Sequence, residues 1–480
     1  MKNELNRAEN FIQNQLSLVN TTYKPILHFS ASTGWINDPN GFSFDGNTFH
    51  LFYQYHPYSS KWGPMHWGHA TSKNLIDWTH LPIALAPSEP YDQSGIFSGT
   101  AMFETKTMRL YYTGHVDLDG NVSQTQCIAE SSDGVHFNKR PENPILDAQS
   151  MPKDSVCADF RDPKVLKRED QYLLLAGSRT QDYRGQILLY SSKDGLRFDY
   201  KNRILFPRSY GDVIECPDLF TMDGQDILVF STQKAEFSTT VQNSFSVFAW
   251  IGLFDVDTYS FKVHSEQILD YGFDFYAPQT TQTTNESYMI AWMNSWERDQ
   301  ITDLLHHQWA GSMTLPRRLY LEKGMLKQAF PDSLEHSLKQ SFHKDLLVLE
   351  PSHTLVIDTN DTYLFKFEIQ LDKGDLQLRF LNDDEHYLQL TLSAELSKAI
   401  LDRSHAQHSI HSKVGENEAI RSMDISADVT CSIVVDKSSI EILINGISMT
   451  SLFYGGEDRK NIKLNVSEVM TLRNVYVYEL

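Results

Sequence analysis

The chain has 480 residues, of which 41% are hydrophobic and 22% charged, the composition of a globular protein with room for two or three domains. Its formal net charge of −20 repels nucleic acids and anionic membranes, so we expect neither as a partner. A local basic pocket could still hold one small phosphorylated ligand. The four cysteines are too sparse and too widely spaced for a disulfide framework or a zinc cluster.

Residues 1–24 predict a helical extension. They contain no apolar core of a secretory signal, and no run of about 20 apolar residues follows, so we expect a cytoplasmic protein. Apolar residues recur at helical spacing and predict one face that docks on the next domain. They are Leu5, Ala8, Phe11, Ile12 and Leu16.

The stretch WINDPNG, residues 35–41, places Asp38 directly before three turn-forming residues. An aspartate there commonly caps the turn by accepting backbone N–H groups. By itself the motif does not separate a turn residue from a catalytic one.

A repeat of about 60 residues follows. Its markers are SKNLIDW ending at Trp78, SSDGVHF ending at Phe137, SKDGLRF ending at Phe198, and DVDTYSF ending at Phe261. Short alternating runs lie between them, as expected for units of about four strands. We therefore predict an all-β fold in which residues 25–323 form a five-bladed β-propeller. The alternative is a set of unrelated hairpins in a sandwich. The blades should open near Asn37, Phe97, Arg161, Glu215 and Tyr276.

Residues 324–345 are rich in Lys, Ser and His and are predicted to be a linker. Strand patterns resume after it, with turn signals such as Asn445-Gly446, and predict a C-terminal β-sandwich over residues 346–480.

Three acids stand at the openings of blades one, three and four: Asp38, Asp162 and Glu215. The first strand of each propeller blade lines the central tunnel, so we expect these acids at equivalent positions around one pocket. Close carboxylates repel one another, so a cluster of them is costly unless a function requires it. The cleavage of a glycosidic bond is such a function, because one carboxylate attacks and another donates a proton. A calcium or magnesium site is the competing reading. No histidine or further carboxylate at ligand spacing accompanies the acids, so we predict no metal and no cofactor.

At these residues the sequence resembles glycoside hydrolase family 32, the β-fructofuranosidases, over residues 24–480. The matching motifs are WINDPNG, FYQYHP, WGPMHWGHATSKNLIDW, GIFSGTA, FRDPKV, ECPDLF, DFYAPQT, AWMNSW and WAGSMTLPR. The resemblance implies a five-bladed propeller joined to a β-sandwich.

It also implies the roles of individual residues. Asp38 would be the nucleophile, Glu215 the general acid and base, and Asp162 the residue that holds the fructose hydroxyls. Arg161, next to Asp162, would keep that carboxylate ionised. The fructose subsite would be shaped by Asn37, Gln54, Trp62, Phe97, Ser98, Arg161, Tyr276 and Trp292.

One position departs from the family: Ile214 precedes the acid where relatives often have Trp, which leaves the leaving-group wall undefined. The neighbouring Cys216 is expected to be a buried spacer and not a second nucleophile.

The resemblance implies a retaining hydrolase that cleaves the terminal β-D-fructofuranosyl bond of sucrose 6-phosphate or sucrose. The alternatives are an exo-acting fructan or fructooligosaccharide hydrolase and a non-catalytic carbohydrate-binding propeller. A phosphate on the glucose side would need a cation, and the sequence offers Arg179, Arg184, His115 and Lys234 without choosing among them. It makes no prediction of the oligomeric state.

Overall fold

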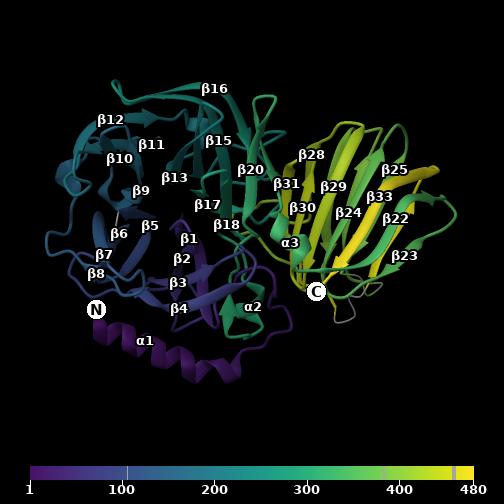
Figure 1. The fold of residues 1–480 in the computed structure, drawn as a ribbon, viewed down its shortest axis with the longest axis horizontal. Coiled ribbons are helices and arrows are strands. Elements are labelled where there is room, and N and C mark those ends of the chain that lie inside the picture. Colours follow the sequence, from purple (N-terminus) through teal and green to yellow (C-terminus); the bar gives the residue numbers. More distant parts are fainter. Residues whose placement is uncertain (105, 382, 384, 457–460) are drawn as a thin grey trace.

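The computed structural model describes residues 1–104, 106–381, 383, 385–456 and 461–480. An N-terminal helix, a ring of five small sheets and a two-sheet sandwich follow one another along the chain (Figure 1). No helix in these ranges is both long and apolar enough to cross a membrane.

Each blade is an antiparallel sheet whose strands lie in chain order. Blade one comprises β1 (Gly34–Phe44), β2 (Phe49–His56), β3 (His66–Ser72) and β4 (Trp78–Leu85). Blade two comprises β5 (Gly95–Glu104), β6 (Thr107–Leu118), β7 (Asn121–Ser131) and β8 (Asn138–Lys139). Blade three comprises β9 (Arg161–Arg168), β10 (Gln171–Arg179), β11 (Gly185–Ser192) and β12 (Asp199–Leu205). Blade four comprises β13 (Val213–Met222), β14 (Gln225–Gln233), β15 (Ser246–Asp255) and β16 (Ser260–Ile268). Blade five comprises β17 (Tyr276–Gln282), β18 (Ser287–Trp292), β20 (Arg317–Glu322) and β21 (Met325–Ala329).

The first strands of the blades form a closed ring. β1 contacts β5 and β17, β9 contacts β5 and β13, and β13 contacts β17. The short strand β19 (Trp309–Ala310), which leaves blade five after helix α2 (Ile301–Leu304), pairs in parallel with the start of β1. This arrangement confirms the propeller and its five openings, and it excludes unrelated hairpins in a sandwich.

The repeated sequence markers are the turns between the third and fourth strands of the blades. In blade two, Ser131 Oγ accepts from the N–H of Gly134, and Asp133 Oδ1 accepts from the N–H groups of Val135 and His136. Blades one and three repeat these bonds around Asn74 and Asp194. An Asn or Asp side chain at the same position of each turn therefore stabilises that turn in three blades.

Helix α1 (Lys2–Gln15) packs on blade one, as its apolar face predicts. Ala8 and Ile12 are buried, and Glu9 accepts from the N–H of Ile83 at 2.7 Å. The prediction for Leu16 is wrong, because the α-helix ends at Gln15 and a 3₁₀ turn (Leu16–Leu18) leaves this side chain exposed.

The sandwich consists of two six-stranded antiparallel sheets around one apolar core. In order across the sheet, one contains β22 (Lys339–Leu349), β33 (Met470–Glu479), β24 (Thr362–Gln370), β29 (Asp428–Asp436), β30 (Ser439–Ile444) and β31 (Ile447–Leu452). The other contains β23 (Leu355–Asp358), β32 (Asn461–Val466), β25 (Asp375–Phe380), β26 (Tyr387–Ser393), β27 (Lys398–His405) and β28 (Ile420–Asp424).

The segment expected to be a linker, residues 324–345, contains regular structure. β21 completes blade five, α3 (Asp332–His336) follows, and β22 has already begun at Lys339. β22 is an edge strand with mostly exposed side chains, which explains why its polar composition resembled that of a linker.

Candidate active site

All five first strands break their pairing register at the same place. The break follows Ile36 in β1, Phe97 in β5, Arg161 in β9, Glu215 in β13 and Tyr276 in β17. Such bulges bend a strand and redirect its side chains, and they are common next to active sites. The residue that lies within each break and directly before a proline, or before Gly99 in β5, is Asp38, Ser98, Asp162, Cys216 or Ala277.

The bulges correct one expectation. Asp38 and Asp162 occupy equivalent positions, each directly before a proline, but Glu215 stands one residue earlier, level with Arg161 and Tyr276. The position in blade four that is equivalent to the two aspartates holds Cys216. Aligning the blades on their DP, DP, CP and AP pairs would have shown this from the sequence.

Asp38 is held by hydrogen bonds to both carboxylate oxygens. Asn37 Nδ2 donates to Oδ1 at 2.9 Å, and Ser98 Oγ donates to Oδ2 at 2.8 Å. Trp35 Nε1 donates to Asn37 Oδ1 at 2.8 Å, which fixes the orientation of the amide. Burial raises the pKa of Asp38 to about 6, and the charge of Glu215 adds to this effect, whereas the Asn37 and Ser98 hydrogen bonds oppose it.

Glu215 also has donors on both oxygens. Arg161 approaches Oε1 with Nε at 3.0 Å and Nη2 at 2.9 Å, and Tyr276 OH donates to Oε2 at 2.5 Å. Arg161 donates in addition to Asp159 Oδ1 at 3.0 Å. Asp159 was not identified from the sequence, although its place two residues before Arg161 is the signal that could have revealed it.

Arg161 acts on the adjacent Asp162 through its charge, which favours the ionised carboxylate, but burial outweighs this effect. Its hydrogen bonds go to Glu215, Asp159 and Gln124. Burial raises the pKa of Asp162 to about 7 although the charge of Arg161 opposes the rise, and the charges of Glu215 and Asp38 contribute to it.

Cys216 lies between the two aspartates. Its N–H donates to Asp162 Oδ2 at 3.0 Å, and its Sγ lies 3.5 Å from that oxygen and 3.8 Å from Asp38 Oδ2. Burial beside these charges holds the pKa of the Cys216 thiol well above its usual range. The thiol is therefore neutral and acts as a donor, in agreement with a spacer and not with a nucleophile.

The three acids thus lie together in one buried cluster. Asp38 and Asp162 share the Cys216 thiol, and the charge of Glu215 acts on both of them. Each acid is exposed over less than a tenth of its surface. In such surroundings their charges interact strongly, because little water screens them.

The other predicted subsite residues lie at different depths. Gln54 is buried and donates to the carbonyl of Ile96 at 2.9 Å. Trp62 is 48% exposed, with its ring edge-to-face on Phe97. Trp292 is fully buried against Trp35 and Trp296, so its ring supports those two indoles.

Ile214 forms no wall of the pocket. It is fully buried in an apolar cluster between blades three and four, packed with residues such as Leu173 and Phe230. Successive side chains of a strand point to opposite faces, so the residue before Glu215 faces away from the pocket.

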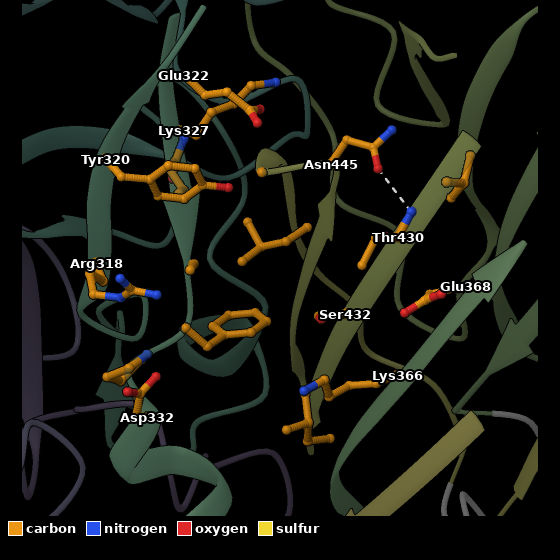
Figure 2. A pocket seen from close by; sticks show the side chains of 18 of the residues that line it. Arg318, Tyr320, Glu322, Lys327, Asp332, Lys366, Glu368, Thr430, Ser432 and Asn445 are labelled. Carbon is orange, nitrogen blue, oxygen red and sulfur yellow. Dashed lines mark hydrogen bonds between the residues drawn. The ribbon is translucent and has the colours of Figure 1, made fainter. Parts of the chain in front are cut away.

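A cavity of about 870 Å³ lies elsewhere, between blade five and the sandwich (Figure 2). Arg318, Tyr320 and Lys327 line it from the propeller and Lys366 and Glu368 from the sandwich, while none of the three acids reaches it. Arginine and lysine side chains and carboxylates both line it, so it shows no preference for a ligand of either charge. Among the described residues, no group of three or more His, Cys, Asp or Glu side chains is arranged to hold a metal ion.

A five-bladed propeller with a cluster of acids at its centre, backed by a β-sandwich, is the architecture of a carbohydrate-cleaving hydrolase. The model of the glycosyl hydrolases family 32 N-terminal domain matches residues 28–329, and that of the family 32 C-terminal domain matches residues 332–479. The chain therefore belongs to glycosyl hydrolase family 32. Within that family it is a β-fructofuranosidase.

Individual relatives agree over nearly the whole chain. A sucrose-6-phosphate hydrolase of Escherichia coli is 33% identical over 495 residues, covering 100% of this chain and 99% of the relative. A sucrose-6-phosphate hydrolase of Zymomonas mobilis is 33% identical over 468 residues, covering 91% of this chain and 86% of the relative. A variant of the Bombyx mori family 32 β-fructofuranosidase, solved in complex with sucrose, superposes with a TM-score of 0.86 at 32% identity and covers 99% of this chain and 97% of that one.

Proposed function

We propose that the protein hydrolyses sucrose 6-phosphate, and sucrose less efficiently, at the fructosyl bond with retention of configuration. The observation that carries the proposal is the burial of Asp38 and Glu215 close enough for their charges to interact, each held by donors on both carboxylate oxygens. The names of the bacterial relatives support the phosphorylated substrate.

In the first step a carboxylate oxygen of Asp38 attacks the anomeric carbon of the fructosyl unit. The bond from that carbon to the glycosidic oxygen breaks, and Glu215 gives its proton to the leaving oxygen. Arg161 and Tyr276, which hold the Glu215 carboxyl, keep it aimed at that oxygen and stabilise the anion that remains.

In the second step Glu215 removes a proton from water as the water attacks the same carbon and displaces Asp38. Fructose leaves, and both carboxyl groups return to their initial states. Asp162 holds hydroxyl groups of the fructosyl unit and stabilises the positive charge that develops on the ring. Over the full cycle Glu215 gives up one proton and takes one back, so the protons balance.

The test compares kcat/KM for sucrose 6-phosphate, sucrose and a short inulin fragment under identical conditions. We expect the highest value for sucrose 6-phosphate. A higher kcat/KM for the inulin fragment would show that the protein is a fructan hydrolase instead. No release of reducing sugar from any of the three substrates would favour a carbohydrate-binding propeller.

Replacing the acid tests its role separately. Glu215→Gln should lower kcat for sucrose by about 10³-fold or more, and much less for an aryl fructoside whose leaving group needs no proton. An equal loss on both substrates would remove Glu215 from the role of proton donor.

A further inference from the structure

We propose that Arg179 binds the phosphate group of a phosphorylated leaving group and is the residue that selects sucrose 6-phosphate over sucrose. This inference rests on the proposed function, since it names a specificity residue of the same site.

Arg179 lies at the end of blade three where β9 begins with Arg161 and Asp162. It is the last residue of β10, which pairs with β9 through Arg161 and Gly177, so Arg179 extends beyond the level of Arg161. β10 runs antiparallel to β9, and its end therefore lies beside the start of β9, which carries Arg161 and Asp162. The Arg179 side chain is 19% exposed, so solvent reaches it.

A single carboxylate connects Arg179 to the general acid. Arg179 Nε donates to Asp159 Oδ2 at 2.5 Å, Arg161 donates to Asp159 Oδ1 at 3.0 Å, and Arg161 in turn binds Glu215. The guanidinium also stacks over the ring of Tyr183, 4.5 Å from its centroid. Stacking and hydrogen bonding hold this side chain in one orientation, so little entropy is lost when it binds a ligand.

The guanidinium keeps donors to spare. Nη1 lies 3.4 Å from the carbonyl of Thr180, a long contact, and nothing among the described residues accepts from Nη2. A planar guanidinium whose Nη2 has no acceptor among the described residues suits the oxygens of a phosphate.

The distribution of charge also favours a phosphate on the side of Arg179. When Glu215 carries the proton that it donates, Arg161 and Arg179 share the carboxylate of Asp159, so these three side chains together carry one positive charge in excess. The opposite side holds Asp38 and Asp162 and repels anions. A phosphorylated substrate therefore binds with its phosphate on the leaving-group side, next to the proton donor.

The other cations suggested by the sequence are engaged elsewhere. Arg184 donates to the carbonyl of Phe206, and Lys234 is paired with Asp212 at 2.9 Å. Burial lowers the pKa of His115 to about 4, so this ring is neutral near pH 7 and stacks on Phe97.

The experiment measures kcat/KM for sucrose 6-phosphate and for sucrose with the full chain and with Arg179→Gln, Arg179→Lys and the control Arg203→Gln. Arg203 lies on the outer strand of the same blade, paired with Asp154. We expect Arg179→Gln to lower the ratio of kcat/KM for sucrose 6-phosphate to kcat/KM for sucrose on the order of 30-fold, because a charge-assisted hydrogen bond is lost. Arg179→Lys should lower this ratio less, and Arg203→Gln should leave it unchanged. An equal loss on both substrates would mean that Arg179 only positions Asp159, and it would overturn the inference.

A second readout separates this inference from the proposed function. With sucrose as substrate, glucose 6-phosphate should inhibit the wild-type enzyme more strongly than glucose does, and Arg179→Gln should abolish the difference. If the enzyme shows no preference for sucrose 6-phosphate but this inhibition behaves as stated, the substrate proposal fails and the phosphate subsite stands. If Arg179→Gln retains both the preference and the stronger inhibition, the subsite is wrong and the substrate proposal stands. Equal inhibition of the wild-type enzyme by the two compounds would overturn the subsite.

Discussion

The Sγ atom of Cys216 lies 3.5 Å from Oδ2 of Asp162, in the place where blade four would otherwise repeat the aspartate of blade three. A third aspartate there would add a charge to a pocket in which burial already raises the pKa of Asp162 to about 7. A neutral thiol fills the position and donates to the carboxylates on either side of it.

We therefore predict that Cys216→Ala retains kcat within about tenfold of the wild-type value, because the thiol takes no part in bond making. In the wild-type enzyme near neutral pH, iodoacetamide should label Cys216 far more slowly than the half-buried Cys157, as measured by peptide mass spectrometry. Rapid labelling of Cys216, or complete loss of activity in Cys216→Ala with the fold intact, would contradict this account.

The acidic side of the pH profile follows from the two aspartates. Asp38 must be ionised to attack, and its pKa is raised to about 6, while that of Asp162 is raised to about 7. We expect kcat/KM to fall as the pH decreases through about 7 to 6, well above the pKa of an ordinary aspartate. A rate that remains constant down to about pH 4.5 would show that neither group titrates as described.

The buried carboxylates also lower stability. The folded state holds the Asp162 proton more tightly than the unfolded chain does, so this group destabilises the fold increasingly as the pH rises from about 4 to 7. Asp162→Asn should therefore raise the free energy of unfolding by about 1–3 kcal/mol near pH 7, and the gain should vanish near pH 4. The measurement is denaturant unfolding at both pH values.

A matched control for this prediction is Asp133→Asn. Asp133 lies in an exposed turn, where backbone N–H groups and His136 hold its pKa below its usual range. Its replacement should lower stability near pH 7. If Asp162→Asn and Asp133→Asn changed the free energy of unfolding in the same direction, the argument that burial makes Asp162 destabilising would be wrong.

Much of this architecture was predictable because it depends on local patterns. The hairpin turns around Asn74, Asp133 and Asp194 use contacts within a few residues, so their repeat in the sequence defined the blades. The partner of Arg161 could not be predicted in the same way. Its hydrogen bond to Glu215 spans 54 positions of the chain and depends on the angle between two blades, whereas Asp162 is adjacent in sequence but points elsewhere.

The interface between propeller and sandwich contains a second buried charged cluster. His28 Nδ1 lies 2.9 Å from Asp436 and Nε2 lies 2.9 Å from Glu441, with all three side chains fully buried. Burial by itself would lower the pKa of His28, but the hydrogen bonds and charges of the two acids raise it to about 9.

Since the folded pKa of His28 exceeds the unfolded value of about 6.5, its contribution to stability is complete below that pH and declines as the pH rises to about 9. We expect His28→Gln to lower the free energy of unfolding by about 3 kcal/mol near pH 6, and by much less above about pH 9. Unfolding curves at the two pH values test this, and a cost that does not depend on pH would show that the ring is neutral in the folded protein.

The central claim is that Asp38 forms the covalent bond to the fructosyl unit. Its most direct test is a rapid acid quench during turnover of sucrose, followed by mass spectrometry of the intact chain and of its peptides. We predict a fraction of enzyme heavier by one fructosyl residue, with the added mass on the peptide that contains Asp38 and none in Asp38→Asn. A label on any other residue, or a product of inverted configuration, would contradict the account.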